Sequence, residues 1–141
     1  MEIRPFEPTD EAAVIALWER CELTRPWNDP RKDIRRKLHV CAELFLVGER
    51  DGKIIATVMV GYEGHRGWIN YLAVAPEHQR QGFGRMMMEE AERLLERERC
   101  PKVNLQVRAE NQAAIEFYQR LGYSVDRVIS MGKRLENDHV R

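Results

Sequence analysis

The stretch Gln79-Arg80-Gln81-Gly82-Phe83-Gly84 separates two apolar patterns of different period. Before it, residues 68–75 form a nearly continuous apolar run, which is typical of a buried β-strand. After it, apolar residues recur at the spacing of an amphipathic helix that begins at Phe83. The stretch therefore predicts a strand-to-helix turn, around which the rest of the fold is arranged.

Gly82 and Gly84 in this turn have two interpretations. They either only turn the chain or form an anion site, because the first turn of a helix has unpaired N–H groups at the positive end of its dipole. Arg80 and Arg85 would add attraction for a phosphate. Two other phosphate motifs are excluded, since no Gly-Lys-Ser/Thr follows and a dinucleotide fingerprint would need a third glycine where Met87 stands.

Composition predicts one globular domain. The chain has 141 residues, 43% of them hydrophobic and 33% charged, which is enough to bury a core. We expect this domain to cover residues 1–135, followed by a polar tail at 136–141. Lys plus Arg and Asp plus Glu number 23 each, so the charge gives no reason to expect nucleic acid or a membrane as a partner.

The cysteines indicate neither a disulfide framework nor a metal site. Cys21, Cys41 and Cys100 are odd in number, widely spaced and without a matching histidine pattern. No signal peptide or membrane-length apolar run is evident. We therefore expect a cytoplasmic protein without a metal ion.

Periodicity and turn signals predict the order β-α-α-β-β-β-α-β-α-β, a mixed α/β domain with a mostly antiparallel sheet flanked by helices. The expected strands cover residues 2–6, 44–49, 54–62, 68–75, 103–107 and 123–131. The expected helices begin near Asp10, Asp29, Phe83 and Asn111. The segment 68–107 should be a parallel, right-handed crossover.

Two residues leave alternatives open at this point. The strand at 68–75 should be central and covered on both faces, so that Asn70 either pairs with backbone at a sheet irregularity or faces a polar pocket. Trp27, on a loop rich in proline, either packs under its loop or belongs to a helix–loop–helix that overhangs a substrate site.

Two motifs together resemble the GCN5-related N-acetyltransferase (GNAT) family. They are Leu72-Ala73-Val74-x-Pro76-x-x-Gln79-Arg80-x-Gly82-x-Gly84 and Asn111-x-x-Ala114-x-x-Phe117-Tyr118-x-x-Leu121-Gly122-Tyr123. The stretches at 25–30 and 61–67 look like those of the small bacterial YpeA-type subgroup. The resemblance implies an acetyl-CoA-dependent N-acetyltransferase that moves an acetyl group directly to a primary amine in a ternary complex.

The resemblance also implies where acetyl-CoA binds. Its pyrophosphate would lie on the turn at 79–85, and its pantetheine arm would pair with the strand before it and end at Asn111. The implied binding residues are Leu72, Ala73, Val74, Gln79, Arg80, Gln81, Gly82, Phe83, Gly84, Arg85, Asn111 and Tyr118.

The resemblance implies that Tyr118 protonates the departing thiolate, since a tyrosine of ordinary pKa near 10 is neutral at pH 7. A related branch that acetylates protein N-termini has Glu where this chain has Gln106, which cannot accept a proton. Glu63 and His65, on the turn entering the strand at 68–75, are the alternative bases, although both would also suit a solvated turn.

The acceptor is left open between a small-molecule amine and a peptide amine. Aromatic and acidic residues would suit a cationic small amine, namely Trp27, Tyr62, Tyr71, Asp29 and Glu63. Other functions that fit the motifs are a catalytically silent acyl-CoA-binding or regulatory module and a protein N-terminal acetyltransferase. Either a monomer or a homodimer is compatible with the sequence.

Overall fold

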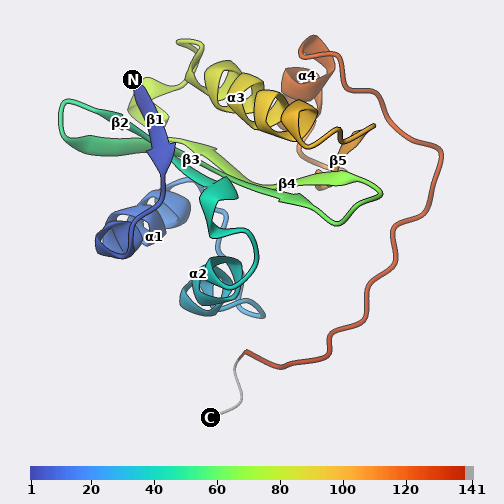
Figure 1. The fold of residues 1–141 in the computed structure, drawn as a ribbon, viewed down its shortest axis with the longest axis horizontal. Helices are drawn as coiled ribbons and strands as arrows, with labels where there is room; N and C mark the ends of the chain where they lie inside the picture. Colours follow the sequence, from blue (N-terminus) through green and yellow to red (C-terminus); the bar gives the residue numbers. More distant parts are fainter. Residues whose placement is uncertain (139–141) are drawn as a thin grey trace.

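A five-stranded sheet in the order β1-β2-β3-β4-β5 forms the middle layer of the molecule (Figure 1). The computed structural model describes residues 1–138. All neighbouring strands are antiparallel except β4 and β5, which are parallel and joined through α3, as expected for the crossover. The mixed, mostly antiparallel α/β class is therefore confirmed.

The elements follow the expected order up to the last helix. The strands are β1 (Glu2–Pro5), β2 (Phe45–Arg50), β3 (Lys53–Tyr62), β4 (Gly67–Val74) and β5 (Val103–Leu105). The helices are α1 (Glu11–Arg20), α2 (Pro30–Leu38), α3 (Phe83–Arg97) and α4 (Gln112–Arg120), with short 3₁₀ turns at Pro8–Asp10, Ala42–Leu44 and Pro76–His78.

Local sequence accounts for the best-predicted boundaries. The Asp51-Gly52 turn joins β2 to β3 with both residues at positive φ, 52° and 76°, which the tight turn of a hairpin requires. Asp29 caps α2 by accepting a hydrogen bond from the backbone N–H of Arg31 at 2.9 Å, and Pro30 stands in the first turn.

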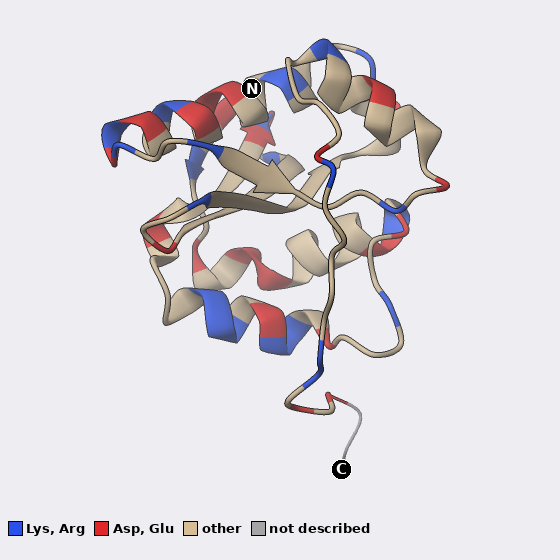
Figure 2. Ribbon diagram, turned by 90° about the vertical axis from the view of Figure 1, so that its right-hand side faces the viewer, with Lys and Arg blue, Asp and Glu red and all other residues tan. Residues whose placement is uncertain are grey.

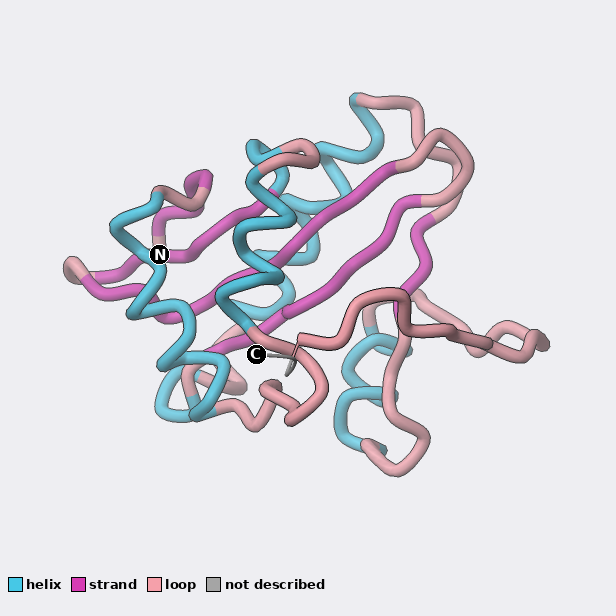
Figure 3. The backbone as a smooth tube through the Cα atoms, turned by 90° about the horizontal axis from the view of Figure 1, so that it is seen from below, coloured by secondary structure: helices cyan, strands magenta, loops and turns pink. Residues whose placement is uncertain are grey.

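Helices cover both faces of the sheet. α1 and α2 lie on one face and α3 and α4 on the other, with the strands side by side between them (Figures 1 and 3). Fully buried side chains come from both helix layers, including Trp18, Ile34, Met87, Met88 and Leu95. Lys and Arg alternate with Asp and Glu over the helices (Figure 2).

The prediction that the strand at 68–75 is covered on both faces is wrong. β4 alternates between buried and exposed at its start, with Gly67 and Ile69 buried and Trp68 and Asn70 exposed. An apolar run alone does not tell which helix covers which part of a sheet. Asn70 lies at an irregularity of the β3–β4 register, but its side chain is exposed and makes no hydrogen bond to backbone within the described residues, so neither of its two alternatives holds.

The predicted final strand at 123–131 is also wrong within the described residues. The segment lies beside β5 through side chains, since Asp126 accepts hydrogen bonds from Lys102 and Asn104, at 3.0 and 2.9 Å, but it forms no ladder with the sheet. β5 has only three residues, so a further strand would have a very short edge to pair with.

The C-terminal segment then passes to the opposite face of the sheet. It leaves α4, crosses the β5 end of the sheet and reaches α2 (Figure 1). Asp138, 6% exposed, accepts hydrogen bonds from the backbone N–H of Asp29 at 2.8 Å and from Arg36 at 2.6 Å. The predicted tail at 136–141 is thus anchored where it is described, and residues 139–141 lie outside the described part.

The ion pair of Arg4 and Asp10 provides a test of this packing by pH. The two Asp10 oxygens accept from Arg4 at 2.8 and 3.0 Å, and this pairing lowers the Asp10 pKa. Because the pKa is lower in the folded state, the stabilisation is present above the unfolded pKa of about 3.9 and is lost as the pH falls through the folded value.

Asp10→Asn is therefore expected to lower the free energy of unfolding by about 1–3 kcal/mol at neutral pH. The difference from wild type should shrink below about pH 4, where the wild-type carboxyl also becomes protonated. Urea unfolding at the two pH values measures both quantities. A difference that does not change with pH would contradict an ionised, paired Asp10.

Candidate active site

β4 has an edge that β5 leaves unpaired. β5 pairs only with Gly67–Ile69, and β4 continues to Val74. Beyond Ile69, no strand within the described chain pairs with this edge of β4. The backbone of residues 70–74 can therefore accept an extended ligand as if it were another strand.

A β-bulge distorts β4 within this unpaired part. Thr57 of β3 faces Ala73 while Met59 faces Asn70, so two residues, Tyr71 and Leu72, stand opposite one. Tyr71 has a φ of +52°, which is uncommon for a residue with a side chain. The bulge directs the Tyr71 ring toward α1 and α2.

Three elements hold the Tyr71 ring and backbone in place. The Trp18 ring of α1 stacks on the Tyr71 ring with centroids 3.8 Å apart, and its indole N–H donates to the Thr57 hydroxyl at 2.9 Å. Thr57 in turn donates to the Tyr71 carbonyl at 2.8 Å. The Tyr71 hydroxyl donates to the Asp33 carboxylate of α2 at 2.6 Å. The bulge is thus tied to both helices of this face.

The turn at 79–84 lies at the carboxyl end of β4. Gly82 caps α3 with φ 88° and ψ 0°, and an added Cβ would meet nothing within 4 Å, so the space in front of α3 is open. Gln79 donates to the carbonyl of Val74 at 2.9 Å, which fixes the turn against the strand. The first N–H groups of α3 face this space, as an anion site requires.

α4 meets the turn at Gly84. A Cβ at Gly84 would lie 3.0 Å from Cζ and 3.2 Å from Cε1 of Phe117, and 3.7 Å from a methyl group of Val74. Gly84 therefore allows α3, α4 and β4 to approach one another closely. Tyr118, the next residue on α4, packs edge-on against Phe117 with ring centroids 5.1 Å apart.

Gly84→Ala should disturb this junction because the Phe117 ring must move to accommodate the methyl group. We expect a loss of about 1–3 kcal/mol in the free energy of unfolding, as for other overpacked sites. Gly61→Ala is the matched control, since a Cβ there has nothing within 4 Å and φ is not positive. Equal urea midpoints for the two variants would contradict the contact.

The Tyr118 hydroxyl is available for chemistry. Burial of the ring raises its pKa to about 12. The hydroxyl has no hydrogen-bond partner within residues 1–138. In this part of the chain every fully buried side-chain N or O atom has a partner, so the Tyr118 hydroxyl is not fully buried. Asn111 uses its side-chain oxygen to cap α4 through the N–H of Ala114, as predicted from its position.

Glu63 and His65 lie on the turn between β3 and β4, at the opposite end of β4 from the turn at 79–84. The Glu63 carboxylate accepts the backbone N–H groups of His65 and Arg66 at 2.6 and 2.5 Å. These bonds hold the pKa of Glu63 below its usual value. Glu63 is thus a weaker base than an ordinary glutamate and has a structural role in its turn.

Trp27 does not pack under its loop. It is 48% exposed, and the guanidinium of Arg108, three residues beyond the end of β5, lies 5.7 Å from its ring centroid. The loop between α1 and α2 therefore faces the end of β5. Gln106, between β5 and Arg108, donates to the Ser130 hydroxyl of the C-terminal segment.

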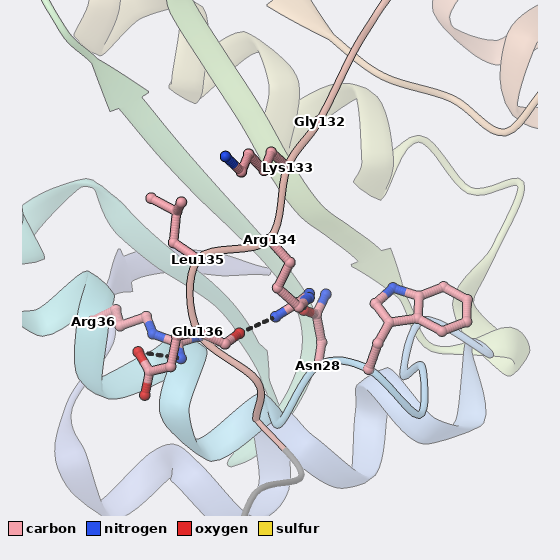
Figure 4. Close-up of a pocket in the computed structure, with 8 residues that line it drawn as sticks. Asn28, Arg36, Gly132, Lys133, Arg134, Leu135 and Glu136 are labelled. Atoms are coloured by element: carbon pink, nitrogen blue, oxygen red, sulfur yellow. Dashed lines mark hydrogen bonds and ion pairs between the residues drawn. The ribbon is translucent and has the colours of Figure 1, made fainter.

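A pocket of about 590 Å³ that is widely open to solvent lies between this loop and the C-terminal segment (Figure 4), and we refer to it as the cavity. It is lined by Trp27, Asn28, Arg36 and residues 132–136. Arg36 also binds Asp33 at 2.9 Å, and Asp33 accepts from the β4 bulge, so the cavity and the bulge are adjacent. A cavity of this size suits a small molecule.

Sequence reasoning missed four residues of this region: Asp33, Arg108, Lys133 and Arg134. Lys133-Arg134 is visible as a basic pair, but it follows the predicted last strand and suggested no site. Asp33 reads as one more charge on a solvated helix.

Within residues 1–138, no group of three or more His, Cys, Asp or Glu side chains could hold a metal ion, and no helix has the length and apolarity to span a membrane.

Comparison with known proteins agrees with this geometry. The acetyltransferase (GNAT) family matches residues 12–123. An acetyltransferase of Yersinia pestis (strain Pestoides F) is 48% identical over 135 residues, 96% of each chain. The solved structure of Ard1 from Thermoplasma volcanium has a TM-score of 0.77 at 25% identity, covering 89% of this chain and 83% of that one.

A second solved structure is an Escherichia coli enzyme, the ribosomal-protein-S18-alanine N-acetyltransferase. It has a TM-score of 0.71 at 28% identity and covers 86% of this chain and 76% of its own. Sequence, family and fold therefore agree. The chain belongs to the GNAT family and is an N-acetyltransferase.

Proposed function

We propose that the protein transfers an acetyl group from acetyl-CoA directly to a primary amine, with both substrates bound at once. One observation supports the proposal: the unpaired edge of β4, the open N-terminus of α3 and, through Phe117, α4 meet at Gly84, and Tyr118 is the neighbour of Phe117 on α4. This arrangement offers a strand edge, an anion site and a proton donor. We also propose a cytoplasmic location and membership of the YpeA-type subgroup.

The residues fit acetyl-CoA. The space in front of Gly82 suits the pyrophosphate, which the N–H groups of residues 81–84 would bind with help from Arg80 and Arg85. The backbone of Leu72, Ala73 and Val74 would pair with the pantetheine arm along the unpaired edge, and Gln79 keeps the turn against this edge. The amide nitrogen of Asn111 is left for the end of the arm, since its oxygen caps α4.

The chemistry follows from the acceptor and the leaving group. The amine nitrogen attacks the acetyl carbonyl carbon, a C–N bond forms and the C–S bond breaks. The thiolate of CoA takes the Tyr118 proton, which a phenol of pKa about 12 retains at neutral pH. The acceptor arrives as an ammonium and gives one proton to a base before it attacks. The second proton leaves its nitrogen after the attack and returns to the Tyr118 phenolate.

Two sets of bases compete for the first of these protons. Glu63 and His65 remain the bases proposed from the sequence. The hydrogen-bonded pair of Tyr71 and Asp33 is the second candidate, favoured by its place at the bulge of β4 beside the cavity. Burial raises the pKa of Tyr71, so its hydroxyl stays neutral and could relay a proton to Asp33.

Paired carboxamide variants distinguish these bases. If Asp33 accepts the proton, Asp33→Asn should lower kcat by about 10²-fold or more, the usual contribution of a general base, while Glu63→Gln stays near wild type. The opposite ranking would assign the base to the turn at 63–66. Thermal unfolding of both variants checks that the fold is retained.

Initial rates with both substrates varied test the order of the reaction. Direct transfer in a ternary complex predicts intersecting double-reciprocal lines. Parallel lines would indicate a covalent acetyl-enzyme instead. Binding of acetyl-CoA with no transfer to any amine would favour the silent acyl-CoA-binding module.

A further inference from the structure

We infer that the acetyl acceptor is a free amino acid or a similar small amine that carries a carboxylate, bound by Lys133 and Arg134 in the cavity beside the β4 bulge. This inference rests on the proposed function, whose acceptor class it narrows. It differs from the cationic amine that the composition of the loops suggested.

The two acidic residues expected to attract a cation, Asp29 and Glu63, already accept hydrogen bonds from backbone N–H groups. The Asp29 carboxylate accepts the N–H of Arg31 at 2.9 Å, and the Glu63 carboxylate accepts two N–H groups of its own turn. Neither lines the cavity. Among the described residues that line the cavity, only Glu136 has a carboxylate, and it is paired with Arg36 at 3.3 Å.

The acidic groups nearest the cavity are turned toward Arg36. Arg36 bonds to Asp33 at 2.9 Å, to Asp138 at 2.6 Å and to Glu136 at 3.3 Å. The Asp138 side chain is fully buried, and the bond from Arg36 holds the pKa of Asp138 well below its usual value. Arg36 is shared among these three carboxylates and cannot neutralise them all, but of the three only Glu136 is largely exposed.

The other two cationic side chains that line the cavity, Lys133 and Arg134, are not paired with a carboxylate. Lys133 makes no hydrogen bond or ion pair in the described part of the chain, and it is exposed. Arg134 donates only to uncharged oxygens, the side chain of Asn28 and the carbonyl of Glu136. In Figure 4 the two side chains leave the C-terminal segment on different sides, Arg134 toward Asn28 and Lys133 away from it.

A third cation, Arg108, does not line the cavity but contacts Trp27, which does. The Arg108 guanidinium lies over the exposed Trp27 ring and has no carboxylate partner among residues 1–138. Lys133, Arg134 and Arg108 together favour a compact anion, and a carboxylate matches the guanidinium and ammonium donors. They disfavour a second positive charge on the acceptor.

The chemistry separates three acceptor classes. A free amino acid has the carboxylate, whereas a peptide N-terminus has an amide at that position and a polyamine has another cation. Since the amino group must face the bulge of β4, the carboxylate of an amino acid can lie only a short distance away. The cavity volume of about 590 Å³ admits a molecule of this size.

Matched ligands test the inference in two ways. Acetyl transfer is measured with L-amino acids and their carboxamides, and with spermidine as a polycation. Binding of the N-acetyl amino acids and N-acetyl amino-acid amides to the CoA-loaded protein is measured by calorimetry. For each preferred amino acid, we expect both kcat/KM and the affinity of the acetylated product to exceed those of the matching carboxamide by about tenfold or more. This factor is the size expected for one charge-assisted hydrogen bond.

Lys133→Ala should reduce that preference with the least effect on folding, because the lysine makes no hydrogen bond or ion pair in the described part of the chain, and Arg134→Ala should reduce it as well. Lys53→Ala is the matched control: Lys53 is an exposed lysine on the β2–β3 hairpin and lines no part of the cavity. The inference would be overturned if the enzyme used carboxylate and amide equally well, if it preferred spermidine, or if no carboxylate bound detectably. Tight carboxylate binding without transfer to any amine would instead contradict the proposed function and leave the anion site standing.

Discussion

Tyr118→Phe is expected to lower kcat by about 10²–10⁴-fold, the range for loss of a general acid, while the affinity for acetyl-CoA stays within about twofold of wild type. The phenyl ring keeps the packing against Phe117 and Tyr123, whose ring centroids lie 5.1 and 5.9 Å away. Because the hydroxyl has no partner in the described chain, its removal should cost little stability. Steady-state kinetics and calorimetry with acetyl-CoA measure the two effects.

The pH dependence gives the control for this prediction. A donor must be protonated, and a pKa of about 12 keeps Tyr118 protonated through the range in which the acceptor amine loses its proton. The wild-type rate should therefore rise with pH and show no decline near pH 10, where an ordinary tyrosine would ionise. Unchanged turnover in Tyr118→Phe would remove Tyr118 from the acid role.

Trp18→Ala is expected to cause the largest loss of stability, about 3–5 kcal/mol in the free energy of unfolding. Trp18 has no exposed surface, it stacks on Tyr71 and Phe45, and its indole N–H bonds to Thr57. Its loss leaves a cavity under the β4 bulge. Urea unfolding measures the change.

Trp18→Phe is the matched variant, since it keeps an aromatic ring against Tyr71 but removes the N–H donor. It should lose less stability than Trp18→Ala, and its kcat should fall if the bulge positions the acetyl group. A loss below about 1 kcal/mol for Trp18→Ala would contradict full burial of the indole.

The sequence predicted best what is determined locally. Asp51-Gly52 specifies its hairpin, Asp29-Pro30 starts α2, and the glycines at 82 and 84 stand where α3 begins, as positive φ and close packing require. Each of these depends on a few adjacent residues.

The two errors of fold concern tertiary coverage. The apolar run at 68–75 says nothing about which face a helix covers, and Trp68 lies 37% exposed. The apolar residues of 123–131 have strand-like composition, but a strand needs an edge to pair with, and Ile129 is 89% exposed. β-propensity depends on neighbours that a single sequence does not show.

The acceptor side of the site was beyond prediction for a related reason. Tyr71 and Asp33 are 38 positions apart, and Arg134 and Asn28 are 106 apart. Nothing in the local sequence links such residues. The proposed cofactor side could be derived from the sequence because its turn is contiguous, from Gln79 to Gly84, and its partner helix carries a recognisable pattern.

Thermal unfolding with and without acetyl-CoA tests the central claim most directly, with ATP and NAD as control ligands. At a hundredfold its dissociation constant, acetyl-CoA should add about 2.7 kcal/mol to the stability and raise the Tm by several degrees. ATP and NAD should produce clearly smaller shifts, because only acetyl-CoA can use the unpaired edge of β4 as well as the anion site. No shift with acetyl-CoA, or an equal shift with ATP, would contradict the site and reduce the turn at 79–84 to a connection between a strand and a helix.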